Sequence, residues 1–498
     1  MQFTSVEYLA FLALSVMVYF ALPGTKSRTI WLLIASYVFY ISLSARWTLA
    51  LFGITAVGYV FGLLIERSGP ASRGAAIPRR TRRLLAVGII LVAGTLFFFK
   101  YAAFSATLLN GALSLVGTSA RTPVLTLALP IGISFWTFQS IAYLVDIARG
   151  KLVAERNPLR FALFVSFFPQ VAAGPIARGG HLLPQLAEKH SFSYERMRSA
   201  LLLMAWGFLK KLLIADPLGV MVRTVFDKPH AFGSDGVLLI GAAVAFSIQI
   251  YCDFSAYTDL ARGAARLFGV DLMKNFDRPY AARSIKEFWR RWHMTLMAWL
   301  KDYIYIPLGG SRVAAWRRYA NILAVFLLSG LWHGAGLTFV VWGLLNGLYQ
   351  ILGDVLAPAR AKALAAFRID RDGHVHRTLQ TLTTFSLITI AWVFFRANTL
   401  GDALYILPRM LNFGPSALWH PGTLELGLSV PQMQVTAIAT VIVFSAEWLS
   451  ARVSLPALLY RQPLVVRWFV YEFTILAIAI FGYYGPMFSA ADFAYFKF

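Results

Sequence analysis

Two histidines stand in unusual surroundings along this chain. His333 lies inside the apolar sequence LLSGLWHGAG at residues 327–336, beside Gly330, Gly334 and Gly336. An ionisable side chain within an apolar run is costly and indicates function, although a neutral histidine bonded to a backbone carbonyl is an open alternative. The glycines allow a ligand or another helix to approach closely.

The second histidine, His293, belongs to the basic and aromatic sequence SIKEFWRRWHMTLMAWLKDYIYIPLGGSR at residues 284–312. Residues 284–301 predict one amphipathic helix that ends before Pro307 and Gly309. Its apolar face would hold Phe288, Trp289, Trp292, His293, Leu296 and Leu300, and the other face Arg290, Arg291 and Lys301. Such a helix could anchor the chain at a membrane surface, or its arginines could bind an anionic cytosolic ligand such as a nucleotide phosphate.

These residue types suit the transfer of an acyl group from a thioester to a hydroxyl. A buried imidazole stays neutral and can take the hydroxyl proton as a general base. A hydrogen-bond donor must stabilise the oxyanion that develops on the acyl carbonyl. His293 could be that donor or could position the substrate, but spacing alone does not bring the two histidines together.

The composition indicates which elements hold these side chains. Of 498 residues, 58% are hydrophobic and 14% are charged, and the mean hydropathy is +0.64. A soluble surface needs about 25% charged residues, so the sequence predicts an integral membrane protein. The excess of 46 Lys and Arg over 23 Asp and Glu fits basic cytoplasmic loops beside anionic lipid. No compact basic domain with interleaved aromatics supports nucleic-acid binding, and the single cysteine, Cys252, excludes a disulfide framework.

Apolar runs recur along the whole chain. They cover residues 6–22, 30–42, 47–65, 84–99, 101–116, 125–145, 161–176, 200–214, 237–250, 320–352, 379–395, 435–444 and 469–484. Several are shorter than a full span, so we predict an all-α polytopic membrane protein with roughly ten to thirteen membrane helices, short or re-entrant ones included. The first run has no basic flank or cleavage site, and we expect a retained span rather than a signal peptide.

Basic segments separate these runs at residues 67–83, 278–291, 312–318 and 360–377. The positive-inside rule assigns them to the cytoplasmic side. We find no internal repeat and no low-complexity tract, and therefore predict a single membrane domain over residues 1–498.

Other motifs are weak. His374 and His376 lie in a charged loop, no H-E-x-x-H sequence occurs, and we expect no metal site and no permanently bound cofactor. Ser329 precedes Gly330 without the context of a membrane serine protease, so we give it no role as a protease nucleophile. Asp253 and Asp259 interrupt an apolar run and could pair with basic residues, either to shape a cavity or as purely structural ion pairs.

Ordered motifs spread along the chain resemble the membrane-bound O-acyltransferase family, in particular its bacterial alginate O-acetyltransferase branch. They are FFFKYAAF (97–104), LPIGISFWTFQSIAYLVD (129–146), SFFPQVAAGPIAR (166–178), GFLKKLLIAD (207–216), YCDFSAYTDLARGAARLFG (251–269), FWRRWHMTLMAWLKDYIYIPLGGSR (288–312), SGLWHGAGLTFVVWGLLNG (329–347), WVFFRA (392–397) and FAYFKF (493–498). Each is weak alone, but their joint order is specific.

The resemblance implies a multi-pass enzyme of the bacterial inner membrane, with helices around a tunnel. His333 corresponds to the residue regarded as catalytic in the family, and His293 to the second signature histidine. Members of this branch take an acetyl group from a cytosolic donor such as acetyl-CoA and pass it across the membrane. An extracytoplasmic partner, often an SGNH-type acetyltransferase, then modifies alginate, another exopolysaccharide or a cell-wall polymer.

Within these motifs, Arg290 and Arg291 are candidates to bind the donor phosphates. Trp332, Asp253, Tyr257 and Asp302 are candidates to line or support the tunnel. Two alternatives stay open: acyl transfer from an acyl carrier protein, as in D-alanyl export, and a transporter or polymer-export channel without covalent chemistry. The thioester that is consumed distinguishes the first alternative. The second predicts donor-independent flux and tolerance of conservative changes at His333.

Overall fold

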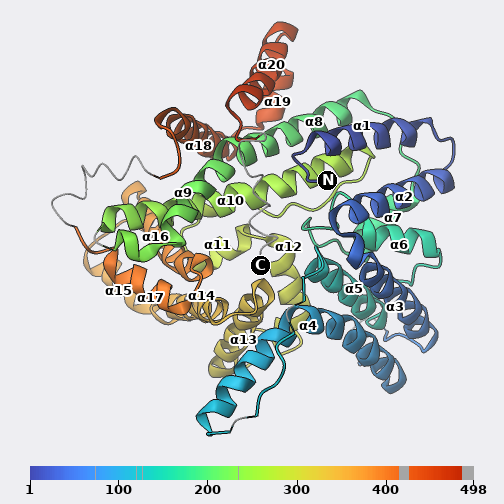
Figure 1. Ribbon diagram of the computed structural model, residues 1–498, viewed down its shortest axis with the longest axis horizontal. Coiled ribbons are helices and arrows are strands. Elements are labelled where there is room, and N and C mark those ends of the chain that lie inside the picture. The colour runs from blue at the N-terminus through green and yellow to red at the C-terminus, as the bar shows by residue number, and fades with distance from the viewer. Residues whose placement is uncertain (73–74, 119, 126, 234, 414–425, 485–498) are drawn as a thin grey trace. The chain divides into compact units, whose positions relative to one another are not determined.

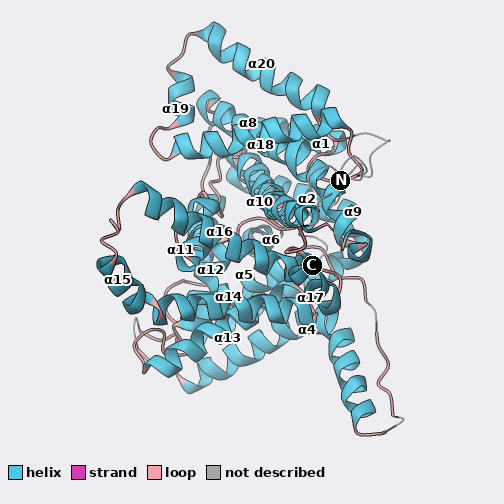
Figure 2. Cartoon of the chain, turned by 90° about the vertical axis from the view of Figure 1, so that its left-hand side faces the viewer, coloured by secondary structure: helices cyan, strands magenta, loops and turns pink. Residues whose placement is uncertain are grey.

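The computed structural model describes residues 1–72, 75–118, 120–125, 127–233, 235–413 and 426–484 (Figure 1). These residues form helices joined by loops, without a strand among them (Figure 2). The predicted all-α fold is therefore confirmed. The closing FAYFKF motif at 493–498 lies outside the described residues.

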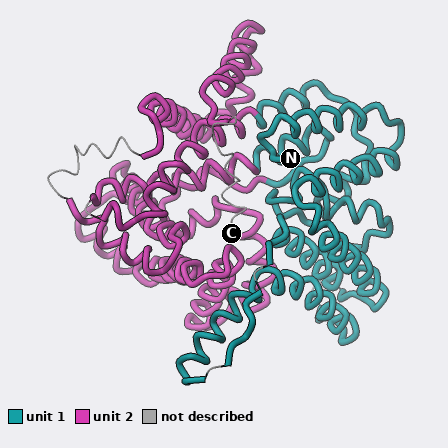
Figure 3. Tube along the Cα trace, viewed as in Figure 1, with its two compact units in different colours: residues 1–204, 258–273 teal, residues 205–257, 274–498 magenta. Residues whose placement is uncertain are grey.

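The chain divides into two compact units (Figure 3). The first holds residues 1–204 and 258–273, and the second holds residues 205–257 and 274–498. The helices α8 and α10 contribute residues to both units. The expectation of a single domain remains a prediction.

The first unit is built around α5, in which fifteen of sixteen residues are buried. The helices α3 and α4 both pack against α5, and α6 packs against α2 and α3. The helices of this unit are α1 (Val6–Ala21), α2 (Thr25–Ser44), η1 (Ala45–Trp47), α3 (Thr48–Arg67), α4 (Arg79–Leu115), α5 (Ile133–Ala148), α6 (Pro158–Ser166), α7 (Gly179–Ala187) and most of α8 (Tyr194–Leu209).

The second unit holds His293, His333 and the other candidate site residues. Its elements are η2 (Lys210–Ala215), α9 (Asp216–Phe226), η3 (Pro229–Phe232), most of α10 (Gly236–Leu267), η4 (Pro279–Ala281), α11 (Ile285–Arg291), α12 (Met294–Leu300), η5 (Lys301–Tyr305), α13 (Ala315–His333), α14 (Leu337–Val355), α15 (Ala357–Ala366), α16 (His374–Arg396), α17 (Leu400–Arg409), α18 (Val430–Ser450), α19 (Leu455–Tyr460) and α20 (Leu464–Phe481).

The helices α13 and α14 form a closely packed hairpin in the second unit (Figure 2). Gly330 and Gly343 lie where the two helices meet, and a Cβ atom on Gly343 would stand 2.4 Å from the carbonyl oxygen of Phe326. A Cβ on Gly330 would stand 2.3 Å from the carbonyl oxygen of Phe339. Only glycine allows the two backbones to approach this closely.

Six helical stretches of the described residues are long and apolar enough to cross a membrane. They are Thr25–Arg67, Arg79–Leu115, Gly236–Leu267, His374–Arg396, Val430–Ser450 and Leu464–Phe481. A seventh results if α14 and α15, bent by 49°, form one span. The predicted ten to thirteen also included short helices, such as the 16-residue α1 and α5. In addition, Thr25–Arg67 is counted once, although it contains α2 and α3, with 20 residues each.

The prediction of one amphipathic helix over residues 284–301 is wrong. The helix α11 ends at Arg291, and α12 starts at Met294, because His293 adopts a left-handed backbone conformation with φ 42° and ψ 55°. The aromatic face is also buried inside the protein: Phe288 and Trp292 are 1% and 2% exposed. These side chains therefore contact the rest of the second unit and do not lie on a membrane surface.

Candidate active site

His333 is the last residue of α13 and lies in an aromatic enclosure. Its side chain is buried, and its ring centroid lies 4.8 Å from that of Trp332, 5.1 Å from that of Trp342 and 5.3 Å from that of Phe395. Trp392 stacks on Trp342 at 5.6 Å and completes the wall behind these rings. These rings enclose the imidazole and leave it little contact with bulk water.

His293 is brought close to His333 through a shared neighbour. The His293 ring lies 5.7 Å from the Trp332 ring, the same indole that contacts His333, and 4.8 Å from the Phe254 ring. Burial disfavours the imidazolium and lowers the pKa of His293 to about 3. Both histidines therefore lie against one indole, and His293 is neutral at physiological pH.

The backbone break at His293 is held by Asn275. The carbonyl oxygen of Asn275 accepts a hydrogen bond from the Met294 amide at 2.9 Å, and its Oδ1 accepts one from Thr295 Oγ1 at 2.7 Å. A non-glycine residue in the left-handed region costs about 1–3 kcal/mol. The hydrogen bonds to Asn275 offset this cost and fix the position of the His293 ring.

A basic cavity of about 450 Å³ lies beside α11 and α12. Four cationic side chains line it, from Lys286, Arg290, Lys301 and Arg318, together with the single carboxylate of Asp354. Apolar residues of α13 form another wall: Ile322, Val325 and Phe326. The cavity has the charge for an anionic ligand and an apolar side for an uncharged part of the same molecule.

Arg291 does not line this cavity. Its Nη2 lies 2.6 Å from Glu287 Oε1, and its Nη1 donates to the carbonyl oxygen of Asp277 at 3.4 Å. Of the two arginines that the sequence suggested for donor binding, the structure thus places Arg290 at the basic cavity and Arg291 in contacts that hold α11 to the preceding loop.

A second cavity of about 490 Å³, the polar cavity, has a different lining. Both signs of charge are present, from Lys211, Arg223, Arg396, Asp216, Asp227 and Asp253, with the amides of Gln249 and Asn398. Phe339 and Phe395 contribute apolar surface. Hydrogen-bonding groups of both signs suit a polar, hydroxyl-bearing ligand better than a strongly anionic one.

A buried ion cluster forms one wall of the polar cavity. Lys211 Nζ lies 2.7 Å from Asp253 Oδ1 and 2.8 Å from Asp216 Oδ1. Burial alone would lower the pKa of Lys211, but the two carboxylates outweigh it and raise that pKa. Burial raises the pKa of Asp216 to about 6, against the opposing effect of the Lys211 ammonium. The predicted pairing of Asp253 with a basic residue is confirmed.

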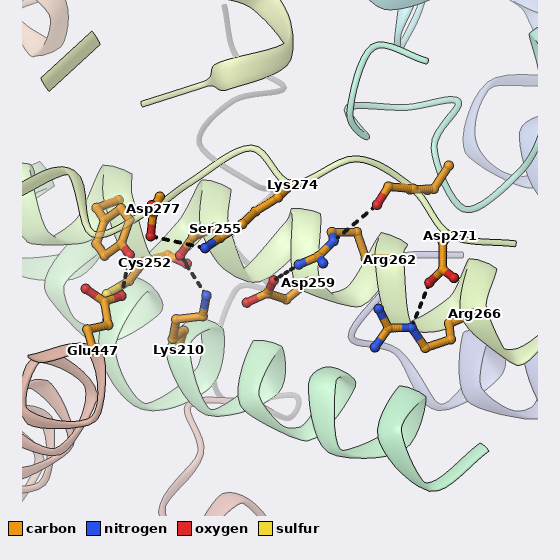
Figure 4. Close-up of polar contacts among 12 residues, drawn as sticks. Lys210, Cys252, Ser255, Asp259, Arg262, Arg266, Asp271, Lys274, Asp277 and Glu447 are labelled. Carbon is orange, nitrogen blue, oxygen red and sulfur yellow. Dashed lines mark hydrogen bonds and ion pairs between the residues drawn. The ribbon is translucent and has the colours of Figure 1, made fainter. Parts of the chain in front are cut away.

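The neighbouring lysine makes a separate contact. Lys210 Nζ donates to Ser255 Oγ at 2.8 Å, as Figure 4 shows. Both lysines are buried, and both belong to the π-helical turn η2. Asp259 pairs with Arg262 one turn along α10, at 3.4 Å (Figure 4).

The other tunnel candidates lie in the same unit. Tyr257 is buried in α10, and the Trp332 ring contacts both histidine rings. Asp302 is half-buried in η5, where Lys301 and Tyr305 line the basic cavity. In the described ranges, no three His, Cys, Asp or Glu side chains are grouped to hold a metal.

The two cavities lie at opposite ends of the α13–α14 hairpin. At the start of α14, Gly336 and Thr338 line the polar cavity, and at its end Gln350 and Asp354 line the basic cavity. A helix of 19 residues is about 28 Å long. On the polar side, the Phe395 ring contacts His333 and also lines the polar cavity. On the basic side, Trp289 packs on Trp342, which contacts His333.

A multi-pass helical protein with a buried histidine between a basic and a polar cavity has the features of a membrane-embedded transferase. The sequence model of the membrane-bound O-acyltransferase family matches residues 124–395. The chain belongs to this family and is an O-acyltransferase.

Relatives support this assignment. The chain is 38% identical over 394 residues to a probable alginate O-acetylase of Pseudomonas aeruginosa, covering 79% of this chain and 71% of the relative. It is 36% identical over 441 residues to the peptidoglycan O-acetyltransferase of Helicobacter pylori, covering 82% and 80%. A teichoic acid D-alanyltransferase of Bacillus subtilis is 29% identical over 237 residues, covering 44% of this chain and 57% of the relative.

The sequence named the two histidines, Arg290 and Asp253, but not the whole site. Five further residues contribute to the site: Asn275, Asn346, Asp216, Gln249 and Arg396. Some of them could have been noticed in the sequence, because they belong to the ordered motifs or are polar residues within apolar runs. Arg396, for example, stands in the WVFFRA motif.

Proposed function

We propose that this O-acyltransferase takes an acetyl group from acetyl-CoA at the basic cavity and transfers it, with His333 as the general base, to a hydroxyl that enters through the polar cavity. The observation that carries the proposal is the position of His333, enclosed by aromatic rings between two cavities at opposite ends of one helical hairpin. The transfer would therefore carry the acetyl group from one side of the membrane to the other.

Charge supports the choice of donor. The phosphates of coenzyme A are anionic, and Lys286, Arg290, Lys301 and Arg318 line the basic cavity. Arg290 and Arg318 also belong to segments that the positive-inside rule assigns to the cytoplasm, where acetyl-CoA is made available. The thioester can then extend along the apolar wall of α13 toward His333.

The chemical step needs one base and no external proton. His333 takes the proton from the acceptor hydroxyl, whose oxygen attacks the thioester carbonyl carbon and forms a tetrahedral oxyanion. When this intermediate collapses, the carbon–sulfur bond breaks and the departing thiolate receives the proton from His333. Exclusion of water by Trp332, Trp342 and Phe395 limits hydrolysis of the thioester.

We place the enzyme in the bacterial inner membrane. The acceptor would be an exopolysaccharide or cell-wall polymer such as alginate, or an SGNH-type partner that passes the acetyl group on to the polymer. The names of the alginate and peptidoglycan O-acetylating relatives support this acceptor class.

The test uses the full-length protein in membranes or proteoliposomes with labelled acetyl-CoA. We expect wild-type protein to release coenzyme A and to label the polymer, and His333→Ala to retain expression and fold but to lose transfer. His374→Ala serves as the matched control and should be fully active, because the structure places this exposed histidine at the start of α16 and not in the loop that the sequence predicted. Full transfer by His333→Ala would contradict the assignment.

The same preparation separates the alternatives. Consumption of an acyl carrier thioester in place of acetyl-CoA would indicate the donor of the D-alanyl class. Flux without any thioester, tolerant of His333→Ala, would indicate a transporter.

A further inference from the structure

One stripe of α13 runs from the basic cavity to His333. Val325, which lines the cavity, Ser329 and His333 follow one another at intervals of four residues. Residues at this spacing lie on the same face of a helix, with each step rising about 6 Å along its axis. If the pantetheine arm of acetyl-CoA extends along this stripe from the cavity toward His333, the thioester at its end passes Ser329.

The hydroxyl of Ser329 is buried and makes no hydrogen bond within the described structure. The side chain is 1% exposed, and Oγ has no hydrogen-bond partner among the described residues. Two other buried helical hydroxyls of this unit, by contrast, bond to the carbonyl one turn earlier: Ser247 to Ala243 at 3.0 Å, and Thr384 to Gln380 at 2.8 Å. An unsatisfied buried hydroxyl costs stability, so its retention beside a reactive centre points to use in binding or catalysis.

We propose that Ser329 Oγ–H donates a hydrogen bond to the carbonyl oxygen of the bound acyl group and stabilises its oxyanion. The inference rests on the proposed function, because it requires acyl transfer at His333. Side chains four residues apart on a helix have Cβ atoms about 5–6 Å from each other. A reacting acyl group therefore fits between them, with its carbonyl oxygen toward Ser329 and the attacking hydroxyl toward His333.

The proton of Ser329 stays on Ser329 throughout this step. As the acceptor oxygen bonds to the carbonyl carbon, the electrons of the C=O double bond move onto oxygen, where the Ser329 hydroxyl meets the new negative charge. The acceptor proton goes to His333 and then to the leaving thiolate. When the C=O bond re-forms, the hydrogen bond from Ser329 weakens again, so the interaction favours the transition state over bound substrate.

The direct test is Ser329→Ala in the full-length protein. We expect kcat to fall about 100- to 1,000-fold, as for loss of one oxyanion donor, with the KM for acetyl-CoA changed less than threefold. The unfolding temperature should stay the same or rise, because the substitution removes no hydrogen bond present in the structure. Ser329→Cys, which keeps the size and a weaker donor, should have intermediate activity.

Ser247→Ala is the matched control, since it removes a buried serine hydroxyl that does have partners, the Ala243 carbonyl and Thr389 Oγ1. It should lower the unfolding temperature and leave kcat unchanged. A purely structural role for Ser329 would instead give a fall in unfolding temperature together with the fall in activity.

Three results would overturn the inference. Wild-type kcat in Ser329→Ala would exclude the donor, and equal activity of the Ala and Cys variants at a lowered unfolding temperature would indicate packing. Acetyl trapped on Ser329 of the wild-type protein would make it a nucleophile instead. An inactive His333→Ala beside a fully active Ser329→Ala refutes only this inference, whereas full activity in both refutes the proposed function.

Discussion

The indole nitrogen of Trp289 donates a hydrogen bond of 3.2 Å to Oδ1 of Asn346. The side-chain amide of Asn346 donates in turn to the carbonyl oxygen of Trp342 at 2.8 Å. Trp289 lines the basic cavity, and Trp342 packs on His333. The hydrogen bond between Trp289 and Asn346 therefore joins the wall of the basic cavity to α14, the helix that places Trp342 against His333.

Replacement of Asn346 should therefore affect both stability and transfer. In Asn346→Leu the Trp289 N–H is left buried without an acceptor, and we expect a loss of about 1–3 kcal/mol in the free energy of unfolding. Denaturant unfolding of the detergent-solubilised protein measures this loss of unfolding free energy. In a double-mutant cycle with Trp289→Phe, we expect a coupling of about 0.5–3 kcal/mol, whereas strictly additive effects would contradict a role for this bond.

Arg290 and Arg291 should behave differently, although they are adjacent. Arg290→Ala removes a cation from the basic cavity, and we expect the KM for acetyl-CoA to rise about tenfold with little change in kcat. Arg291→Ala breaks a partly exposed pair with Glu287 and should cost about 1 kcal/mol of stability or less, with KM unchanged. Steady-state kinetics at several acetyl-CoA concentrations measures both, and equal increases in KM would contradict the assignment of Arg290.

Close packing of the hairpin depends on Gly343. A Cβ at this position would clash with the Phe326 carbonyl oxygen, and we expect Gly343→Ala to lower stability by about 1–3 kcal/mol and to reduce transfer as α13 shifts. Gly353 lies on the same helix, and a Cβ there meets no atom within 4 Å. Gly353→Ala should be neutral or stabilise by up to about 1 kcal/mol, and thermal unfolding of the two variants provides the comparison.

The buried neutral His293 predicts an acid-sensitive fold. Its pKa is lowered by burial to about 3, so the folded state resists protonation while the unfolded chain accepts a proton near its ordinary pKa of about 6.5. This contribution to stability is complete above pH 6.5 and is lost as the pH falls toward 3. Between pH 7 and pH 5 we expect a loss of about 2 kcal/mol from this group.

The pH dependence can be assigned by substitution. His293→Gln has no group that titrates in this range, so the difference in unfolding free energy between pH 7 and pH 5 should shrink by about 2 kcal/mol. An unchanged difference would mean that His293 is protonated in the folded protein. His374→Ala should keep the full pH dependence.

The sequence predicted the all-helical membrane fold and identified both histidines as candidate site residues. Apolar runs and an ionisable side chain within such a run are local signals. The break at His293 has no such signal, since the helical pattern of Trp289, Trp292 and Leu296 continues through it. Hydrogen bonds from Met294 and Thr295 to Asn275, almost twenty residues earlier in the chain, decide the backbone there.

The cavities were also beyond the sequence, because distant segments build them. Arg290 and Asp354 both line the basic cavity, and Lys211 and Arg396 both line the polar cavity. A run of basic residues gives no information on which side chains face inward. The separate placements of Arg290 and Arg291 illustrate this, since only tertiary contacts distinguish the two.

The rings of Trp342, Trp392 and Phe395 around His333 have a consequence for bioenergetics. Ions cross a narrow aromatic constriction poorly because they would lose their hydration shell. In the proposed reaction, an acetyl group passed from donor to acceptor at His333 would cross these rings in covalently bound form, without a continuous column of water. We therefore expect a cell to hold many copies of this enzyme without dissipating its proton gradient.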